Sequence, residues 1–209
     1  MLADILAIVL HFGLQLMTLA LLLRFILQAV RADFYNPISQ MIVRVSDPVL
    51  RPMRRLIPGW GGLDLGALAA ALLTEIVHIS ALATLALYGA NPRAIYGYLS
   101  NDPLQVVAIL SAGGLPIVAV VATASVWLLQ WVLGIYLAAL FGTVILSWIA
   151  PFSSHPGALL IRQITEPVLA PIRKRLPPMG GLDFSVMIAI LIIYILEQAV
   201  IPRLLAGTF

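Results

Sequence analysis

The sequence has no cysteine and little charge, since only 10% of its 209 residues are Asp, Glu, Lys or Arg. Without cysteine, the chain has no disulfide, no thiolate metal ligand and no cysteine nucleophile. Soluble domains contain about 25% charged residues, so this chain has too little charge to cover a water-facing surface. Because 62% of the residues are hydrophobic, the composition indicates an integral membrane protein, whose lipid-facing exterior is apolar.

Common catalytic motifs are also missing. The sequence contains no Gly-x-Ser-x-Gly, no P-loop, no dinucleotide fingerprint and no zinc-protease helix. Glu75 and His78 have the E-x-x-H spacing of carboxylate-bridged metal bundles, but this spacing occurs once in a chain with three histidines. We therefore expect no enzymatic activity, no cofactor and no metal ion.

Four apolar segments are long enough to cross a bilayer, because about 20 residues at ~1.5 Å each cover its ~30 Å core. Asp64 and Asp183 precede two of these segments and are predicted helix N-caps. A further apolar segment, residues 104–125, is broken by glycines and a proline at 113–116, so we expect an interfacial or re-entrant helical pair there. The predicted spans cover about residues 2–30, 65–88, 127–148 and 184–201.

Basic residues are concentrated in two loops, which precede the second and the fourth span. The loop between the second and third spans contains only Arg93. The positive-inside rule then predicts that both basic loops lie in the cytoplasm and both termini in the periplasm. The nine basic residues of the two rich loops are Arg31, Arg44, Arg51, Arg54, Arg55, Arg162, Arg173, Lys174 and Arg175.

The sequence repeats itself at a shift of 119 residues. Residues 47–64 (DPVLRPMRRLIPGWGGLD) match residues 166–183 (EPVLAPIRKRLPPMGGLD) at ten of eighteen positions without a gap. Both copies place the same basic segment between two spans, so the repeats are parallel and related by a pseudo-axis along the membrane normal. The expected organisation is a first repeat (1–90), a connecting segment (91–125) and a second repeat (126–209).

Each repeat contains a predicted amphipathic helix in the membrane interface, over residues 38–57 and 157–176. In the first copy, apolar residues recur at helical spacing while Arg44, Arg51 and Arg55 share the other face. Because Pro48 lacks a backbone donor, we expect this helix to restart after Asp47. Arginines at the interface gain roughly 1 kcal/mol each from anionic lipid, so the expected partner is the lipid headgroup layer and not nucleic acid.

These motifs resemble those of a known family. The run DFYNPISQ at residues 33–40, the doubled P-x-x-x-P-x-R with P-x-x-GG-x-D, and the four-span layout are similar to the YggT family of bacterial inner-membrane proteins. Copy two has PFSSHP where copy one has DFYNP. The family motif falls on Pro48, Pro52, Arg54, Pro58, Gly62 and Asp64, and again on Pro167, Pro171, Arg173, Pro177, Gly181 and Asp183.

The resemblance implies a non-enzymatic, multi-spanning protein of the bacterial inner membrane. Relatives are linked to osmotic or ion tolerance, to the neighbourhood of cell division and, in plastids, to cytochrome assembly. Two hypotheses of function follow. The first is an assembly or scaffolding factor that presents its basic helices to lipid and protein partners. The second is an ion channel or transporter that acts in osmotic or ion homeostasis.

Arg24, Glu75, His78 and Glu197 lie inside the predicted spans, where charge is costly. His11 of the first span is a further candidate, for proton transfer or haem binding, although a lone histidine in a span is more often a hydrogen-bonded structural residue. We expect Arg24 to reach Glu75. The shift of 119 makes His78 and Glu197 equivalent, so these two side chains are expected to meet across the pseudo-axis. The four residues form either an ion or proton path or a set of interhelical pairs that fix the packing.

Small residues at every fourth position of the second and third spans predict close helix contacts. The contacts can lie within one chain or between the chains of a homo-oligomer. The residues are Gly66, Ala70 and Thr74 in the second span and Gly134, Ala138 and Gly142 in the third.

Overall fold

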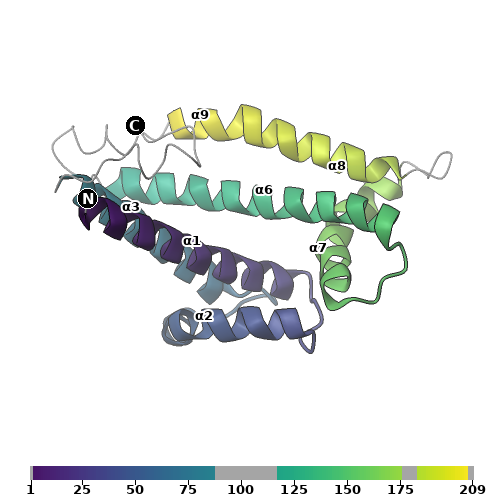
Figure 1. The fold of residues 1–209 in the computed structure, drawn as a ribbon, viewed down its shortest axis with the longest axis horizontal. Coiled ribbons are helices and arrows are strands. Elements are labelled where there is room, and N and C mark those ends of the chain that lie inside the picture. Colours follow the sequence, from purple (N-terminus) through teal and green to yellow (C-terminus); the bar gives the residue numbers. More distant parts are fainter. Residues whose placement is uncertain (1, 88–116, 176–182, 207–209) are drawn as a thin grey trace.

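The computed structural model describes residues 2–87, 117–175 and 183–206, and within these ranges the secondary structure is helical (Figure 1). Four helical segments are long and apolar enough to cross a membrane, as the sequence predicted. They are α1 (Leu2–Ala29), α3 (Leu65–Leu87), α6 (Ile117–Ile149) and the continuous run of α8 (Phe184–Ile195), η1 (Leu196–Val200) and α9 (Ile201–Ala206). Two further helices, α2 (Pro37–Leu56) and α7 (Pro156–Arg173), connect the spans of each repeat.

The helix that contains the predicted third span begins before it. Residues 117–125, which we assigned to the broken segment, form the first turns of α6. The physical reason is that the last helix breaker, Pro116, stands directly before this helix, where proline is tolerated. Residues 104–116 lie outside the described residues, so the expected interfacial or re-entrant structure there remains a prediction.

The helix that contains the predicted fourth span continues beyond it. We expected Pro202 to stop it, but the helix continues to Ala206 through the wider π-helical turn η1. Proline has no N–H and its ring clashes with the carbonyl four residues before it. The π-helical turn η1 lies just before Pro202 and replaces the i→i+4 hydrogen bonds by i→i+5 bonds. This change in backbone spacing accommodates the proline ring, so the helix continues past Pro202.

The helices form a bundle with distinct ends. Helices α1, α3 and α6 lie side by side, and α8 and α9 pack on α6 (Figure 1). The start of α1 and the end of α9 lie at one end of the bundle, whereas α2 and α7 lie at the other (Figure 1). This arrangement confirms the parallel repeat, because both basic interfacial helices are on the same side of the spans.

Helices α2 and α7 begin in the same way and touch at their N-termini. Asn36 caps α2 by accepting from the Ile38 N–H at 2.9 Å, and His155 caps α7 by accepting from the Gly157 N–H at 3.2 Å. A proline follows each cap, where its missing N–H costs nothing. The Asn36 amide nitrogen also donates to the Pro156 carbonyl at 2.8 Å, which joins the two helix starts.

Small residues set the closest helix packing. On α3, Ala67, Ala70 and Ala71 are fully buried and let this helix approach α1 and α2. On α6, the predicted close contact within the chain is found only at Gly142, where an added Cβ would stand 3.1 Å from Ile161 Cδ1 of α7. Gly134 has no such neighbour within 4 Å and Ala138 is exposed, so these positions make no close contact in the described chain.

Candidate functional site

The turn from α2 into α3 is fixed by the family motif of the first repeat. Gly61 and Gly62 have φ of 63° and 85°, a left-handed backbone that favours glycine. Asp64 then caps α3, with Oδ1 accepting from the Ala67 N–H at 3.1 Å. Arg54 of α2 donates to Asp64 Oδ2. This arginine–aspartate bridge therefore fastens the interfacial helix to the start of the next span, with Asp64 almost fully buried at 1% exposed.

The second repeat builds the same bridge from equivalent residues. Asp183 caps α8 by accepting from the Ser185 N–H at 3.0 Å, and Arg173 Nε donates to Asp183 Oδ2 at 2.9 Å. Arg173 also pairs with Glu166 at 2.8 Å. Unlike Asp64, the Asp183 side chain is 42% exposed. The motif residues Pro177 and Gly181 lie outside the described residues.

These contacts shift the ionisation of the second bridge. Partial burial would raise the pKa of Asp183, but the hydrogen bonds from Ser185 and Arg173 outweigh it and lower that pKa below its usual value. Burial would lower the pKa of Arg173, but its hydrogen bond to Asp183 and the nearby carboxylates raise it. The bridge is therefore an ion pair at neutral pH.

Arg24 lies beneath α2 and not beside Glu75, so the predicted Arg24–Glu75 pair is wrong. Its guanidinium, in a side chain 9% exposed, donates from Nη1 to Asp47 Oδ1 at 2.5 Å, to Ser46 Oγ at 3.0 Å and to the Val43 carbonyl at 3.1 Å. Arg24 stands five residues before the end of α1, or about 8 Å, so its long side chain reaches the interface more easily than the bilayer centre.

Asp47 is held by two arginines. The hydrogen bond from Arg24 lowers the pKa of Asp47 against the opposing effect of desolvation, and Arg51 adds to the lowering. Because its carboxylate is engaged in this way, Asp47 does not cap a new helix. The predicted restart is wrong: α2 runs unbroken through Pro48 and Pro52. Beside Asp47, the Ser46 hydroxyl donates to the Ile42 carbonyl at 2.7 Å and Arg24 donates to the Val43 carbonyl at 3.1 Å.

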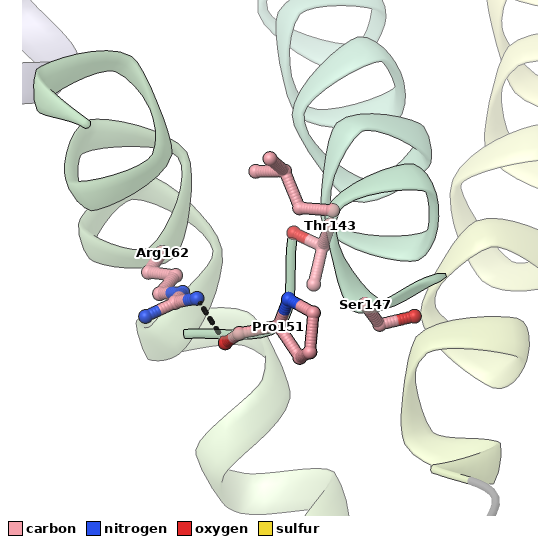
Figure 2. Close-up of a pocket in the computed structure, with 5 residues that line it drawn as sticks. Thr143, Ser147, Pro151 and Arg162 are labelled. Atoms are coloured by element: carbon pink, nitrogen blue, oxygen red, sulfur yellow. Dashed lines mark hydrogen bonds between the residues drawn. The ribbon is translucent and has the colours of Figure 1, made fainter. Parts of the chain in front are cut away.

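The second repeat lacks this buried arginine. Thr143 stands at the position of Arg24 and Thr165 at that of Ser46, with their hydroxyl oxygens 3.4 Å apart. A cavity of about 160 Å³ remains there. Figure 2 shows Thr143 and Ser147 of α6 beside it, and Arg162 of α7 turned to the Pro151 carbonyl, to which it donates at 2.6 Å. The two repeats have therefore diverged beneath their interfacial helices.

Three titratable side chains form a hydrogen-bonded chain between α1 and α3. His78 Nδ1 lies 2.9 Å from Glu75 Oε2, and His78 Nε2 lies 3.0 Å from His11 Nδ1. Glu75 and His78 are fully buried and His11 is 6% exposed. The Trp127 ring of α6 lies 6.0 Å from the His78 ring, measured between centroids. We call these three residues the His–His–Glu chain.

The predicted meeting of His78 with Glu197 is not found. Both ring nitrogens of His78 are bound to residues of the first repeat, and Glu197 lies half-buried in η1. The run from α8 to α9 packs on α6, which itself packs on α3 (Figure 1). The pseudo-axis therefore relates His78 and Glu197 without bringing them together.

His11, which the sequence offered as a separate candidate for proton transfer or haem binding, is instead joined to His78. The depth of the two histidines explains this contact. His11 is nine residues from the start of α1 and His78 is nine residues from the end of α3. On two antiparallel neighbours this puts both histidines about 14 Å from the same end.

The fold and these sites define a multi-spanning α-helical membrane protein built from two parallel repeats. The sequence model of the CCB3/YggT family matches it twice, at residues 3–85 and 122–204, which are one match per repeat. The chain belongs to this CCB3/YggT family.

Several bacterial proteins resemble the chain over most of its length. An uncharacterised protein of Pseudomonas aeruginosa is 43% identical over 194 residues, which cover 93% of this chain and 87% of that protein. An uncharacterised protein of Vibrio alginolyticus is 37% identical, with coverage of 83% and 81%. YggT of Escherichia coli K12, also uncharacterised, is 33% identical, with coverage of 89% and 84%. No solved structure matches the chain.

Proposed function

We propose that the protein is a non-enzymatic scaffold or assembly factor of the bacterial inner membrane. The observation that supports this role is the joined pair α2 and α7 at one end of the bundle, each bridged to the following span by the motif arginine and aspartate. We call α2 and α7 together the interfacial platform. The concentration of basic residues around it favours the cytoplasmic side, with both termini in the periplasm.

The exposed side chains of the platform suit contact with lipid and with another protein. Met41 and Val45 of α2 are 59% and 50% exposed, so part of its apolar surface faces away from the bundle. Arg51 is 77% exposed, and anionic headgroups attract such arginines. Tyr35 and Trp60 flank α2 and are 84% and 80% exposed, as is typical of aromatic residues at a membrane interface.

The test is crosslinking in native membranes, followed by purification in mild detergent and mass spectrometry of bound proteins and lipids. Arg44 and Arg55 are exposed on α2 and have no ion pair among the described residues. We expect the double variant Arg44→Gln/Arg55→Gln to lose crosslinked partner or anionic lipid. The matched control is Arg203→Gln, an exposed arginine on α9 at the opposite end of the bundle. Purification that repeatedly yields neither partner nor enriched anionic lipid contradicts the proposal.

A second candidate function is ion transport in osmotic or ion homeostasis. It is favoured by Glu75 and His78, which are 0% exposed inside a span, because ionisable residues in spans often belong to transport paths. Flux into proteoliposomes tests it. Loss of flux in Glu75→Gln supports transport, and no flux under any ion gradient contradicts it.

A further inference from the structure

The His–His–Glu chain lies at the middle depth of the bundle. Glu75 is ten residues from the start of α3, or about 15 Å along the helix, which is half of the ~30 Å apolar layer. Glu75 and His78 are fully buried and His11 is 6% exposed, so water has little or no access to these polar groups. The hydrogen bonds from His78 to Glu75 and to His11 therefore bear directly on where the protons of the site lie.

Two shared hydrogens satisfy the two contacts of the chain. A hydrogen bond between His78 Nδ1 and Glu75 Oε2 needs one proton, and the bond between His78 Nε2 and His11 Nδ1 needs another. With Glu75 ionised and both histidines neutral, His78 donates to Glu75 and His11 donates to His78. Both bonds are then made, but the chain has a net charge of −1.

One added proton removes this charge without breaking either bond. The proton binds to His11 Nε2, and the hydrogen on His11 Nδ1 passes to His78 Nε2. His78 is then an imidazolium that donates to Glu75 on one side and to neutral His11 on the other. The sum of charges is zero, which a low-dielectric interior favours over an isolated carboxylate.

We propose that Glu75, His78 and His11 form a proton-binding site inside the membrane, which takes up one proton on His11 and stores it on His78 beside Glu75. The second carboxylate oxygen, Glu75 Oε1, is buried and has no hydrogen-bond partner among the described residues. Its unused acceptor capacity marks a site whose charge is not compensated by the surrounding helices. The site depends neither on a scaffold role nor on ion flux.

Other charged groups belong to the helices around the site. On α1 these are Asp4, seven residues before His11, and Arg24, which is bound to Asp47. On α3 there is none besides Glu75, and α6 has no charged residue along its length. On α9, which packs on α6, the charged residue is Arg203. Helix α2, which also packs on α1 and α3, carries Arg44, Asp47, Arg51, Arg54 and Arg55, and η1 carries Glu197. Among these charged groups of the described residues, Glu75 is the one hydrogen-bonded to His78.

The geometry favours a proton over a metal ion. The ring nitrogens of His11 and His78 face each other at 3.0 Å, within hydrogen-bond distance. Metal ligands would instead converge on a common point about 2 Å from each donor atom. Among the described residues no group of three or more His, Asp or Glu side chains is placed to hold a metal ion.

The experiment is a pH titration of ¹⁵N-histidine-labelled protein in lipid nanodiscs, followed by nitrogen NMR. The chain has three histidines, and the third, His155, is exposed at the start of α7 and serves as an internal reference. We expect the His11 and His78 signals to change together at one midpoint. In Glu75→Gln this joint midpoint should move by about one pH unit or more, while that of His155 stays unchanged.

Two variants complete the design. Glu197→Gln changes the acid at the position equivalent to His78 in the second repeat and should leave the joint transition unchanged. His11→Gln keeps a donor for His78 Nε2 but removes the entry nitrogen, so the His78 transition should move even if Glu75→Gln does not fold. The proposal is overturned if His11 and His78 titrate separately and independently of Glu75. It is also overturned if neither titrates while the protein stays folded, or if purified protein holds one metal ion per chain that is lost in His11→Gln.

Discussion

The two arginine–aspartate bridges predict different losses when their caps are removed. Asp64→Ala removes an N-cap, worth about 0.5–2 kcal/mol, and a charge-assisted bond from Arg54, worth about 1.5–3 kcal/mol when buried. Arg54 is 42% exposed and regains water, so we expect a total loss near 2–4 kcal/mol. Asp183→Ala removes the equivalent cap, but its bridge is exposed on both sides, at 38% and 42%, and adds about 0–1 kcal/mol.

The measurement is the free energy of unfolding in mixed micelles, followed by the fluorescence of the four tryptophans. Asn caps as well as Asp, so Asp64→Asn and Asp183→Asn keep the cap and remove only the charge. We expect Asp64→Asn to cost more than Asp183→Asn by about 1–2 kcal/mol, because the Arg54 pair is the more buried. If both aspartate sites cost the same in both series, burial does not strengthen the first bridge and the reasoning is wrong.

The contacts of α2 and the shared side of the platform give three more tests. Arg24→Thr, which introduces the residue found at the equivalent position of the second repeat, should lower the free energy of unfolding by about 2–3 kcal/mol because Asp47 loses its shortest bond. Arg51→Ala should lower it by less than about 0.5 kcal/mol because Arg51 is exposed. Equal losses in the two variants would contradict the stabilising role of the buried Arg24. Because the pKa of Asp47 is lowered in the folded state, its ionised carboxylate stabilises the fold fully above the ordinary pKa of 3.8, and this stabilisation is lost as the pH falls through the lowered pKa. The free energy of unfolding of Asp47→Asn should therefore depend less on pH below 3.8 than that of the unchanged protein. Gln40→Cys and Leu159→Cys, both exposed on the platform, should react with an impermeant thiol reagent from the same side of the membrane; labelling from opposite sides would refute the parallel repeat.

Local chemistry explains why several features could be predicted from the sequence. A span is recognised by its length and hydropathy, and a cap by an aspartate before an apolar run, so α3 and its cap Asp64 needed no knowledge of neighbours. The repeat placed Asp183 in the same role. The common side of α2 and α7 followed from the even number of spans between them.

Partner choice is different because it depends on how each helix is turned and which helix stands beside it. Arg24 and Glu75 were paired by depth, but depth does not say that α2 passes over Arg24 and offers it Asp47. His78 was paired with Glu197 by the symmetry of the repeat. In the structure, the buried alanines of α3 let this helix pack closely on α1, and His78 forms its hydrogen bond with His11 instead.

The amino-acid sequence by itself thus determined the spans, the repeat and the helix starts, since these depend on interactions along the chain or with the membrane. Only the tertiary structure decided which polar groups meet, because side-chain packing between helices sets their rotation and order. The contacts that depend on this packing are the ion pair between Arg24 and Asp47 and the His–His–Glu chain.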